Sequence, residues 1–265
     1  MRYIQLYFHL ISINLRSQMQ YRVSFVFSLL VVFLTYSVEF ITIMFALDKF
    51  GGIRGWSLYQ VAFMYGIVTV AYALARIMFC GFQRFPNMVK WGMVDRFLIR
   101  PIDERFQLVA YELPLNRLGQ VILGIIVLIF AIIHLDIKPG LSNILFLVVT
   151  ILSGTLLYGA LFIISAAIAF WAVESRELMG IMTHGTLRMI SYPISIYRPI
   201  LRNIVIFIIP VAFINYFPCL HFFSYDPLGF PVFFRYLGPV VSVMVFYLSL
   251  LFWDFGLKRY QSTGN

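Results

Sequence analysis

Two ionisable side chains, Glu39 and Arg76, interrupt stretches of sequence that are otherwise strongly apolar. Each belongs to a row of polar residues that repeats at helical spacing. Such rows either line a path for a polar solute or a subunit interface, or simply pack helices together, with Arg76 extending toward water. Glu39 and Arg76 are expected at different levels, and Tyr65 is nearer to Glu39. The candidate path or interface residues are Thr35, Glu39, Thr42, Tyr65, Thr69, Tyr72 and Arg76.

Enzymatic chemistry has little support in the remaining reactive residues. The four lysines, Lys49, Lys90, Lys138 and Lys258, all lie outside any GxxxxGK[ST] phosphate-binding loop. The four histidines are scattered without metal-ligand spacing, and there is no G-x-S-x-G motif. We therefore assign no catalytic residue and no metal site, and any work driven by a nucleotide must come from a partner subunit.

The composition points to a membrane protein. Hydrophobic residues make up 62% of the 265 residues and charged residues only 12%, whereas soluble domains carry about 25% charged residues. The net charge of +9 does not indicate nucleic acid, because the basic residues lie between apolar runs. We predict one all-α membrane domain, 1–265, with an interfacial amphipathic helix at 1–22. Six spans are expected at about 24–47, 57–79, 118–135, 142–172, 200–217 and 236–255.

Lysine and arginine residues set the expected orientation. With the amino-terminal segment inside, fifteen of the twenty fall on inner segments and four on outer ones, which predicts cytoplasmic termini. The outer connections at 48–56 and 136–141 are then short. The inner connections, 80–117 and 173–199, hold most of the chain that lies outside lipid.

The inner segment Phe85–Asp103 is the most distinctive passage, because it is basic and amphipathic between two apolar runs. Pro86 can open a helix, Gly92 interrupts it, and Arg100 before Pro101 stops the next piece. We expect two short amphipathic helices joined by a bend. One face would contact the membrane or the spans, and the other a soluble partner; alternatively, this is a solvated loop that anchors topology.

Three passages carry a resemblance to a known family. The segment Gly92–Pro101, GMVDRFLIRP, resembles the G-x-x-D-x-x-L-x-R-P pattern in the cytoplasmic loop of permease subunits of type-2 ABC exporters. The stretch Tyr192–Pro218 is similar to the fifth span of a bacterial subfamily, and the tail Arg259–Asn265 resembles its Y-x-S-x-G ending. The similarity runs over the whole chain.

The resemblance implies a permease that pairs with a second, identical or homologous permease in the bacterial cytoplasmic membrane. It also implies a separate ATPase subunit, which would hold ATP and Mg²⁺, and a re-entrant element between spans five and six, for which 218–235 is suited. A membrane-embedded enzyme, a secondary transporter and a membrane scaffold are the alternatives. The residues expected to couple to the ATPase are Met88, Lys90, Gly92, Asp95, Arg96, Arg100, Pro101, Glu174, Arg176 and Glu177.

Overall fold

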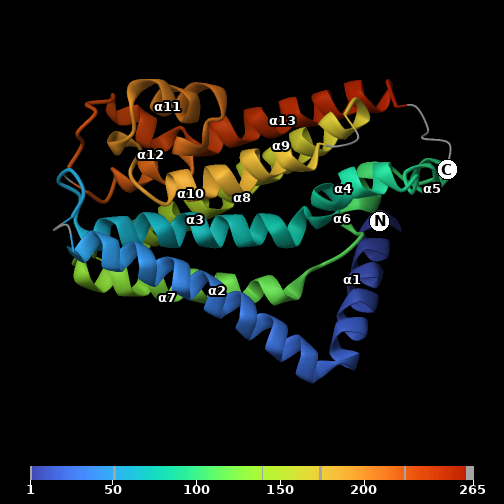
Figure 1. The fold of residues 1–265 in the computed structure, drawn as a ribbon, viewed down its shortest axis with the longest axis horizontal. Coiled ribbons are helices and arrows are strands. Elements are labelled where there is room, and N and C mark those ends of the chain that lie inside the picture. Colours follow the sequence, from blue (N-terminus) through green and yellow to red (C-terminus); the bar gives the residue numbers. More distant parts are fainter. Residues whose placement is uncertain (1, 50–51, 139, 173–174, 224, 261–265) are drawn as a thin grey trace.

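A computed structural model describes residues 2–49, 52–138, 140–172, 175–223 and 225–260. The fold is a bundle of helices whose long axes run in one general direction (Figure 1). Within these described residues, five helices are long and apolar enough to cross a membrane, which confirms the prediction of an all-α membrane fold. They are α2 (Arg22–Lys49), α3 (Leu58–Met78), α7 (Leu118–His134), α8 (Leu141–Ala167, extended by a 3₁₀ turn to Phe170) and α13 (Gly238–Leu257).

The other α-helices lie at the two ends of the bundle and along one side. They are α1 (Arg2–Gln20), α4 (Cys80–Lys90), α5 (Asp95–Leu98), α6 (Glu104–Val109), α9 (Arg176–Gly180), α10 (Thr186–Ile190), α11 (Pro199–Asn203) and α12 (Tyr216–Cys219). The end that carries α4, α5 and α6 is called the α4 end here, and the end with the α2–α3 and α7–α8 connections is the opposite end (Figure 1).

Helix α3 is the centre of the bundle, because fourteen of its 21 residues are buried, including every residue from Val61 to Ala73. Its glycine Gly66 faces Gly124 of α7 so closely that a side chain at either position would collide with the other helix. Small residues at such contacts let helix backbones approach, which is how helices associate where lipid offers no hydrophobic drive. Apolar residues on the outer sides of α2, α7, α8 and α13 are exposed, as expected for lipid contact.

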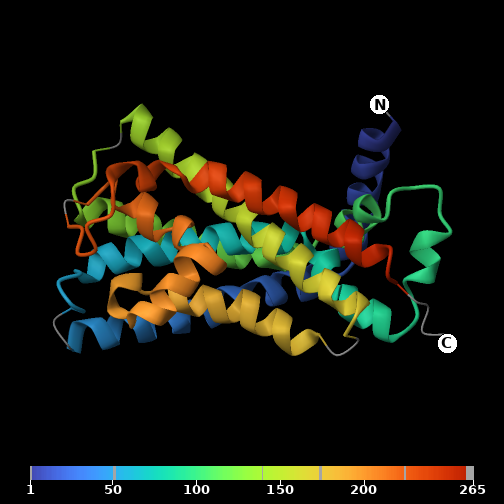
Figure 2. The same cartoon turned by 90° about the horizontal axis from the view of Figure 1, so that it is seen from above.

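Helices α8 and α13 form the second layer of the bundle. Viewed from above, α8 crosses the long axis of the molecule obliquely and α13 lies along it (Figure 2). The obliquity of α8 agrees with its length, since a long apolar helix fits a bilayer by tilting.

The segment from Arg176 to Ile190, expected in the inner connection 173–199, is part of the bundle instead. Helix α9, a π-helical segment at Ile181–Gly185 and α10 follow one another and pack on α3 and α8. Two of the polar residues that made this segment look solvated have partners on the long helices: His184 hydrogen-bonds Tyr72, and Arg188 pairs with Glu39. It ends beside the opposite end, where the Trp56 indole donates to Ser195.

The stretch 200–217, expected as one span, consists of two pieces bent by 75°: Pro199–Ile208 and Val211–Cys219. Pro210 lies at the break and removes a helical hydrogen bond there. The bent pair therefore precedes the predicted re-entrant stretch 218–235. That stretch itself contains the end of α12 and a 3₁₀ turn at Val232–Tyr236.

Aromatic rings close the opposite end of the bundle. Trp56 is almost fully buried, and its ring lies 5.8 Å from that of Tyr216 and 5.3 Å from that of Tyr225. Phe63 of α3 meets Phe222 and Phe223 in edge-on contacts. This end is consequently packed with rings rather than hollow.

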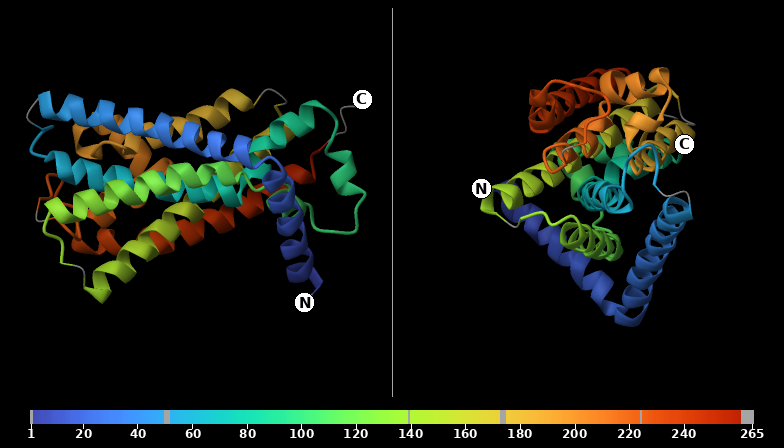
Figure 3. Two further views of the ribbon diagram at one scale, coloured as in Figure 1. Left: turned by 90° about the horizontal axis from the view of Figure 1, so that it is seen from below. Right: turned by 90° about the vertical axis from the view of Figure 1, so that its left-hand side faces the viewer.

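Helix α1 meets α2 at a sharp elbow around Tyr21 and points away from the bundle axis (Figure 3). The side chain of Gln18 donates a 2.7 Å hydrogen bond to the carbonyl of Leu113, in the connection before α7. The elbow therefore stands apart from the rest of the α4 end, but it is tied to it at this point.

Candidate functional site

Helix α4 is fixed beneath the long helices by aromatic packing. The ring of Phe85 lies 4.7 Å from that of Trp253 on α13 and 5.1 Å from that of Phe170 at the end of α8. Met88 and Val89 on the same face are also buried. The apolar face of the predicted amphipathic segment thus contacts the chain's own helices. The helix begins at Cys80, six residues before Pro86, because it follows α3 almost without interruption.

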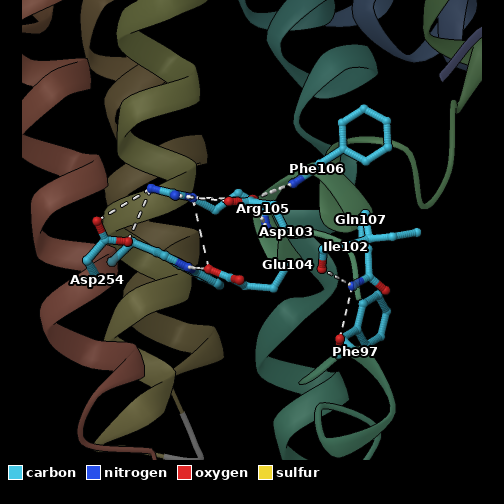
Figure 4. A network of polar contacts seen from close by, with 9 residues as sticks. Phe97, Ile102, Asp103, Glu104, Arg105, Phe106, Gln107 and Asp254 are labelled. Atoms are coloured by element: carbon cyan, nitrogen blue, oxygen red, sulfur yellow. Dashed lines mark hydrogen bonds and ion pairs between the residues drawn. The ribbon is translucent and has the colours of Figure 1, made fainter. Parts of the chain in front are cut away.

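Helix α6 lies directly against α4. A side chain at Gly81 would place its first carbon 1.9 Å from the carbonyl oxygen of Leu108, so only glycine allows this approach. Two amide hydrogen bonds hold the loop before α6, since Gln107 donates to the carbonyls of Phe97 and Ile102 (Figure 4). The helices α4, α5 and α6 therefore form one compact unit.

An ion-pair network attaches this unit to α13 (Figure 4). Asp103 caps α6 by accepting from the amides of Arg105 and Phe106, and the Arg105 guanidinium lies 3.0 Å from its carboxylate. The other side of Arg105 reaches Asp254 of α13 at 3.2 Å. Burial alone would raise the pKa of Asp103, but the hydrogen bonds from Arg105 and the two amides outweigh it and lower that pKa. The hydrogen bond to Asp103 raises the pKa of Arg105.

The outward side of α4 and α5 is both apolar and basic. Ile99 is 83% exposed and Trp91 66%. Exposed large apolar side chains with polar residues around them are typical of a surface that contacts another protein or the membrane. Lys90, Arg96, Arg100 and Pro101 are exposed around them. We call these six residues the α4–α5 surface.

The predicted coupling residues are divided by the structure. Lys90, Arg96, Arg100 and Pro101 belong to the α4–α5 surface, whereas Met88 is buried beneath it. Gly92 makes the turn between the two helices with a positive φ of 64°, a conformation that favours glycine. Asp95 accepts a hydrogen bond from Tyr260.

The remaining coupling candidates come from the segment before and within α9. Glu177 is exposed on α9, which packs near α4. Glu174 and the side chain of Arg176 lie outside the described residues.

A polar cavity of about 1030 Å³ opens at the α4 end, between the α1–α2 elbow and the bundle. Arg76 reaches it from the last turn of α3, Arg84 from α4, and Arg117 from the 3₁₀ turn before α7. Arg84 is paired with Glu112 at 2.8 Å. The other polar lining residues are Asn14, Ser17, Gln18, Ser24, Ser28, Gln83, Asn87, Asn116, Thr183 and His184. We call this space the main cavity.

A second cavity of about 250 Å³ lies between α2 and α10 and shares Arg117 and His184 with the main cavity. Its wall includes Thr35 and Glu39, and Glu39 lies 3.8 Å from Arg188. His184 stands where the two cavities meet, on the π-helical segment, and is held by the 3.0 Å hydrogen bond with Tyr72. Single π turns within helices are frequent at functional sites.

The seven predicted path residues are therefore only partly brought together. Thr35 and Glu39 line the second cavity, Arg76 lines the main cavity, and Tyr72 reaches their junction through His184. Thr42 is exposed and bonds its own helix.

Two of the seven are packed inside the bundle, away from both cavities. Thr69 is buried, and Tyr65 donates to the carbonyl of Tyr36 rather than to Glu39.

Three residues that the sequence did not single out also line the two cavities: Arg117, His184 and Arg188. Arg117 and Arg188 counted only as inner charges, and His184 as one of four scattered histidines. A basic residue directly before an apolar run, and a histidine close to ordinary polar residues such as Thr183 and Thr186, are weak signals. Their meaning depends on which helix faces them.

Comparison with known proteins agrees with this architecture. A search of curated proteins finds no match. Residues 33–264, which include all five long helices in whole or in large part, match the family described as ABC-2 family transporter protein. Because the match covers most of the chain, the protein belongs to the ABC-2 family of transporter proteins and is a membrane permease component of an ABC transporter.

Proposed function

We propose that this chain is the membrane-spanning subunit of an ATP-driven exporter, coupled to a separate ATPase through the α4–α5 surface. The observation that carries the proposal is the pairing of an exposed apolar and basic surface with a rigid attachment to the spans. The chain lacks a phosphate-binding loop of its own, so the nucleotide and its Mg²⁺ belong to the partner.

The attachment offers a route for motion between the partner and the path. Force applied to Trp91 or Ile99 reaches α13 through Arg105 and Asp254, and reaches α8 through the contact of Phe85 with Phe170. Helix α4 also continues α3, whose last turn places Arg76 in the main cavity. A rigid shift of the unit of α4, α5 and α6 would therefore change the shape of that cavity.

The distribution of basic residues supports cytoplasmic placement of the α4 end, in the cytoplasmic membrane of a bacterium. With α9 and α10 in the bundle, the α4 end carries twelve lysines and arginines and the opposite end six. The excess is smaller than expected from the sequence but has the same sign. The twelve are Arg2, Arg16, Arg22, Arg84, Lys90, Arg96, Arg100, Arg105, Arg117, Arg176, Lys258 and Arg259.

A second permease, identical or homologous, would complete the path. The second cavity lies between α2 and α10, and the Arg188 side chain at its rim is 80% exposed although it pairs with Glu39. Exposed apolar residues continue this side, with Ile181 at 66% and Ile200 at 75% exposed. A partner helix covering this side would enclose the polar residues that line the second cavity.

Copurification tests the proposal. The tagged chain is expressed in its native host, extracted in mild detergent, and its ATPase partner and vanadate-sensitive ATP turnover are measured. Replacing Arg96 and Arg100 by glutamate should remove the ATPase, because the α4–α5 surface would then repel a partner matched to its positive charge. Lys138→Glu, a charge reversal at the opposite end, is the control. Retention of the ATPase by the double variant contradicts the docking assignment.

A further inference from the structure

The main cavity has an excess of positive charge that the chain itself does not neutralise. Three arginines line it, and the only carboxylate among its described lining residues, Glu112, is already paired with Arg84. Arg76 and Arg117 line the same cavity and make no ion pair with any described residue. Two guanidinium groups thus face the same space without a counter-charge.

Hydrogen-bonding groups in this wall are also left without partners. Among the described residues, the buried Nε of Arg117 has no acceptor. The Nε of Arg76 makes only a long bond of 3.4 Å to Gln83. A buried donor without an acceptor is costly, so the cavity is set up for a ligand that supplies oxygen atoms.

We propose that the main cavity binds a phosphate group, carried either as the monoester headgroup of an amphiphile or as free inorganic phosphate. A dianion matches the two unneutralised guanidinium groups, and each planar guanidinium can donate two parallel hydrogen bonds to phosphate oxygens. His184, the one histidine among the described lining residues, stands at the inner edge of the site beside Tyr72.

The shape of the wall accommodates both carriers. Tyr21 and Phe25 at the elbow, and Tyr111 and Met179 across from it, give the cavity an apolar side that a short acyl chain would contact. The polar side holds Arg76 and Arg117. An amphiphile would use both sides, whereas inorganic phosphate would use only the second.

The assignment deepens the proposed function, since it names the chemical class of the transported solute. Only the role of the bound phosphate as transported solute rests on that function.

Binding is measured on the full chain, purified in maltoside with whatever partners accompany it, by isothermal titration. The probes are inorganic phosphate, dioctanoyl phosphatidic acid and, as an uncharged counterpart, dioctanoylglycerol. Arg76→Gln and Arg117→Gln should each weaken binding of the phosphate-bearing probes about tenfold, since a charge-assisted bond is lost. Arg198→Gln, at an exposed arginine outside the cavity, should leave it unchanged.

The probes assign the source of the phosphate. Equal affinity for inorganic phosphate and for phosphatidic acid supports a free anion, and tighter binding of phosphatidic acid supports an amphiphile. If a glutamine variant does not fold, Arg117→Lys retains the charge but loses the fork, and it should weaken binding severalfold.

The proposal is overturned if neither phosphate-bearing probe binds the parent chain. It is overturned equally if dioctanoylglycerol binds as tightly as phosphatidic acid, or if the cavity variants keep the parent affinity. Loss of the ATPase during purification would count against the proposed function but would not alter this titration.

Discussion

Replacing Gly81 by alanine should separate α6 from α4 and weaken the whole α4 end. The added carbon would lie 1.9 Å from the Leu108 carbonyl oxygen and 2.7 Å from its carbonyl carbon. Both atoms are backbone, so no side chain can rotate away. Restoring an ordinary contact of 3.4 Å requires a displacement of about 1.5 Å between the two helices.

The size of the effect follows from the cost of overpacking, which is about 1–3 kcal/mol and falls at the upper end where backbone must move. For a chain of this size, about 2–3 kcal/mol corresponds to a fall in melting temperature of about 5–10 °C. The assay is thermal unfolding in maltoside micelles, followed by tryptophan fluorescence. Because α6 carries Arg105, the variant should also copurify less ATPase.

The matched control is Gly185→Ala. Its added carbon would meet nothing closer than a carbonyl oxygen at 3.9 Å, so alanine should be neutral or slightly stabilising. A Gly81→Ala variant that melts within 1 °C of the parent would refute the reasoning, because the helices could not then be as close as described.

Three further perturbations test other contacts. Asp254→Asn should lower the free energy of unfolding by no more than about 1 kcal/mol, as for a partly exposed pair, yet speed tryptic cleavage after Arg105; unchanged cleavage would show that the pair does not hold α6 against α13. Asp103 has a lowered pKa in the folded chain, so its ionised form stabilises the fold above the unfolded pKa of about 3.9, and this contribution is lost as pH falls through the folded value. The difference in melting temperature between the parent and Asp103→Asn should therefore be present at pH 6 and decrease as the pH is lowered below about 3.9; a constant difference argues against the pair. Glu39→Gln removes the partner of Arg188 and should reduce transport while leaving assembly intact, and transport at the parent rate would limit Glu39 to packing.

The long helices could be predicted from the sequence because their signal is local. An apolar run of about twenty residues has few alternatives to a span, and five of the six predicted spans contain a long helix in the described part of the chain. The sixth, 200–217, is bent at Pro210. The segment Arg176–Ile190 was not predicted as part of the bundle, because its polar residues have partners far away in the chain. His184 meets Tyr72, and Arg188 meets Glu39, over 100 residues apart in each pair. Neither partnership is visible in a window of twenty residues.

The candidate site was predictable to the extent that it depends on amphipathicity. The inner segment was expected to turn one face to the membrane or the spans and the other outward, and Phe85 is buried against the spans whereas Arg96 and Arg100 are exposed. Met88, expected to couple to the ATPase, is buried instead. Helix α6 was not foreseen, because it is short and is held by Gln107 and by contact with Gly81 rather than by a strong helical pattern. The main cavity depends on the α1–α2 elbow, whose direction no periodicity specifies.

The ring cluster around Trp56 makes the two ends of the bundle different: the opposite end is filled by aromatic rings, whereas the main cavity opens at the α4 end. Both polar cavities lie away from it, so the packed rings of Trp56, Tyr216 and Tyr225 separate the main cavity from the opposite end. Under the proposed function, a solute that left by the opposite end would require the indole of Trp56 to give up its bond to Ser195 and the rings to part. ATP hydrolysis in the partner would then act on the opening of this ring cluster.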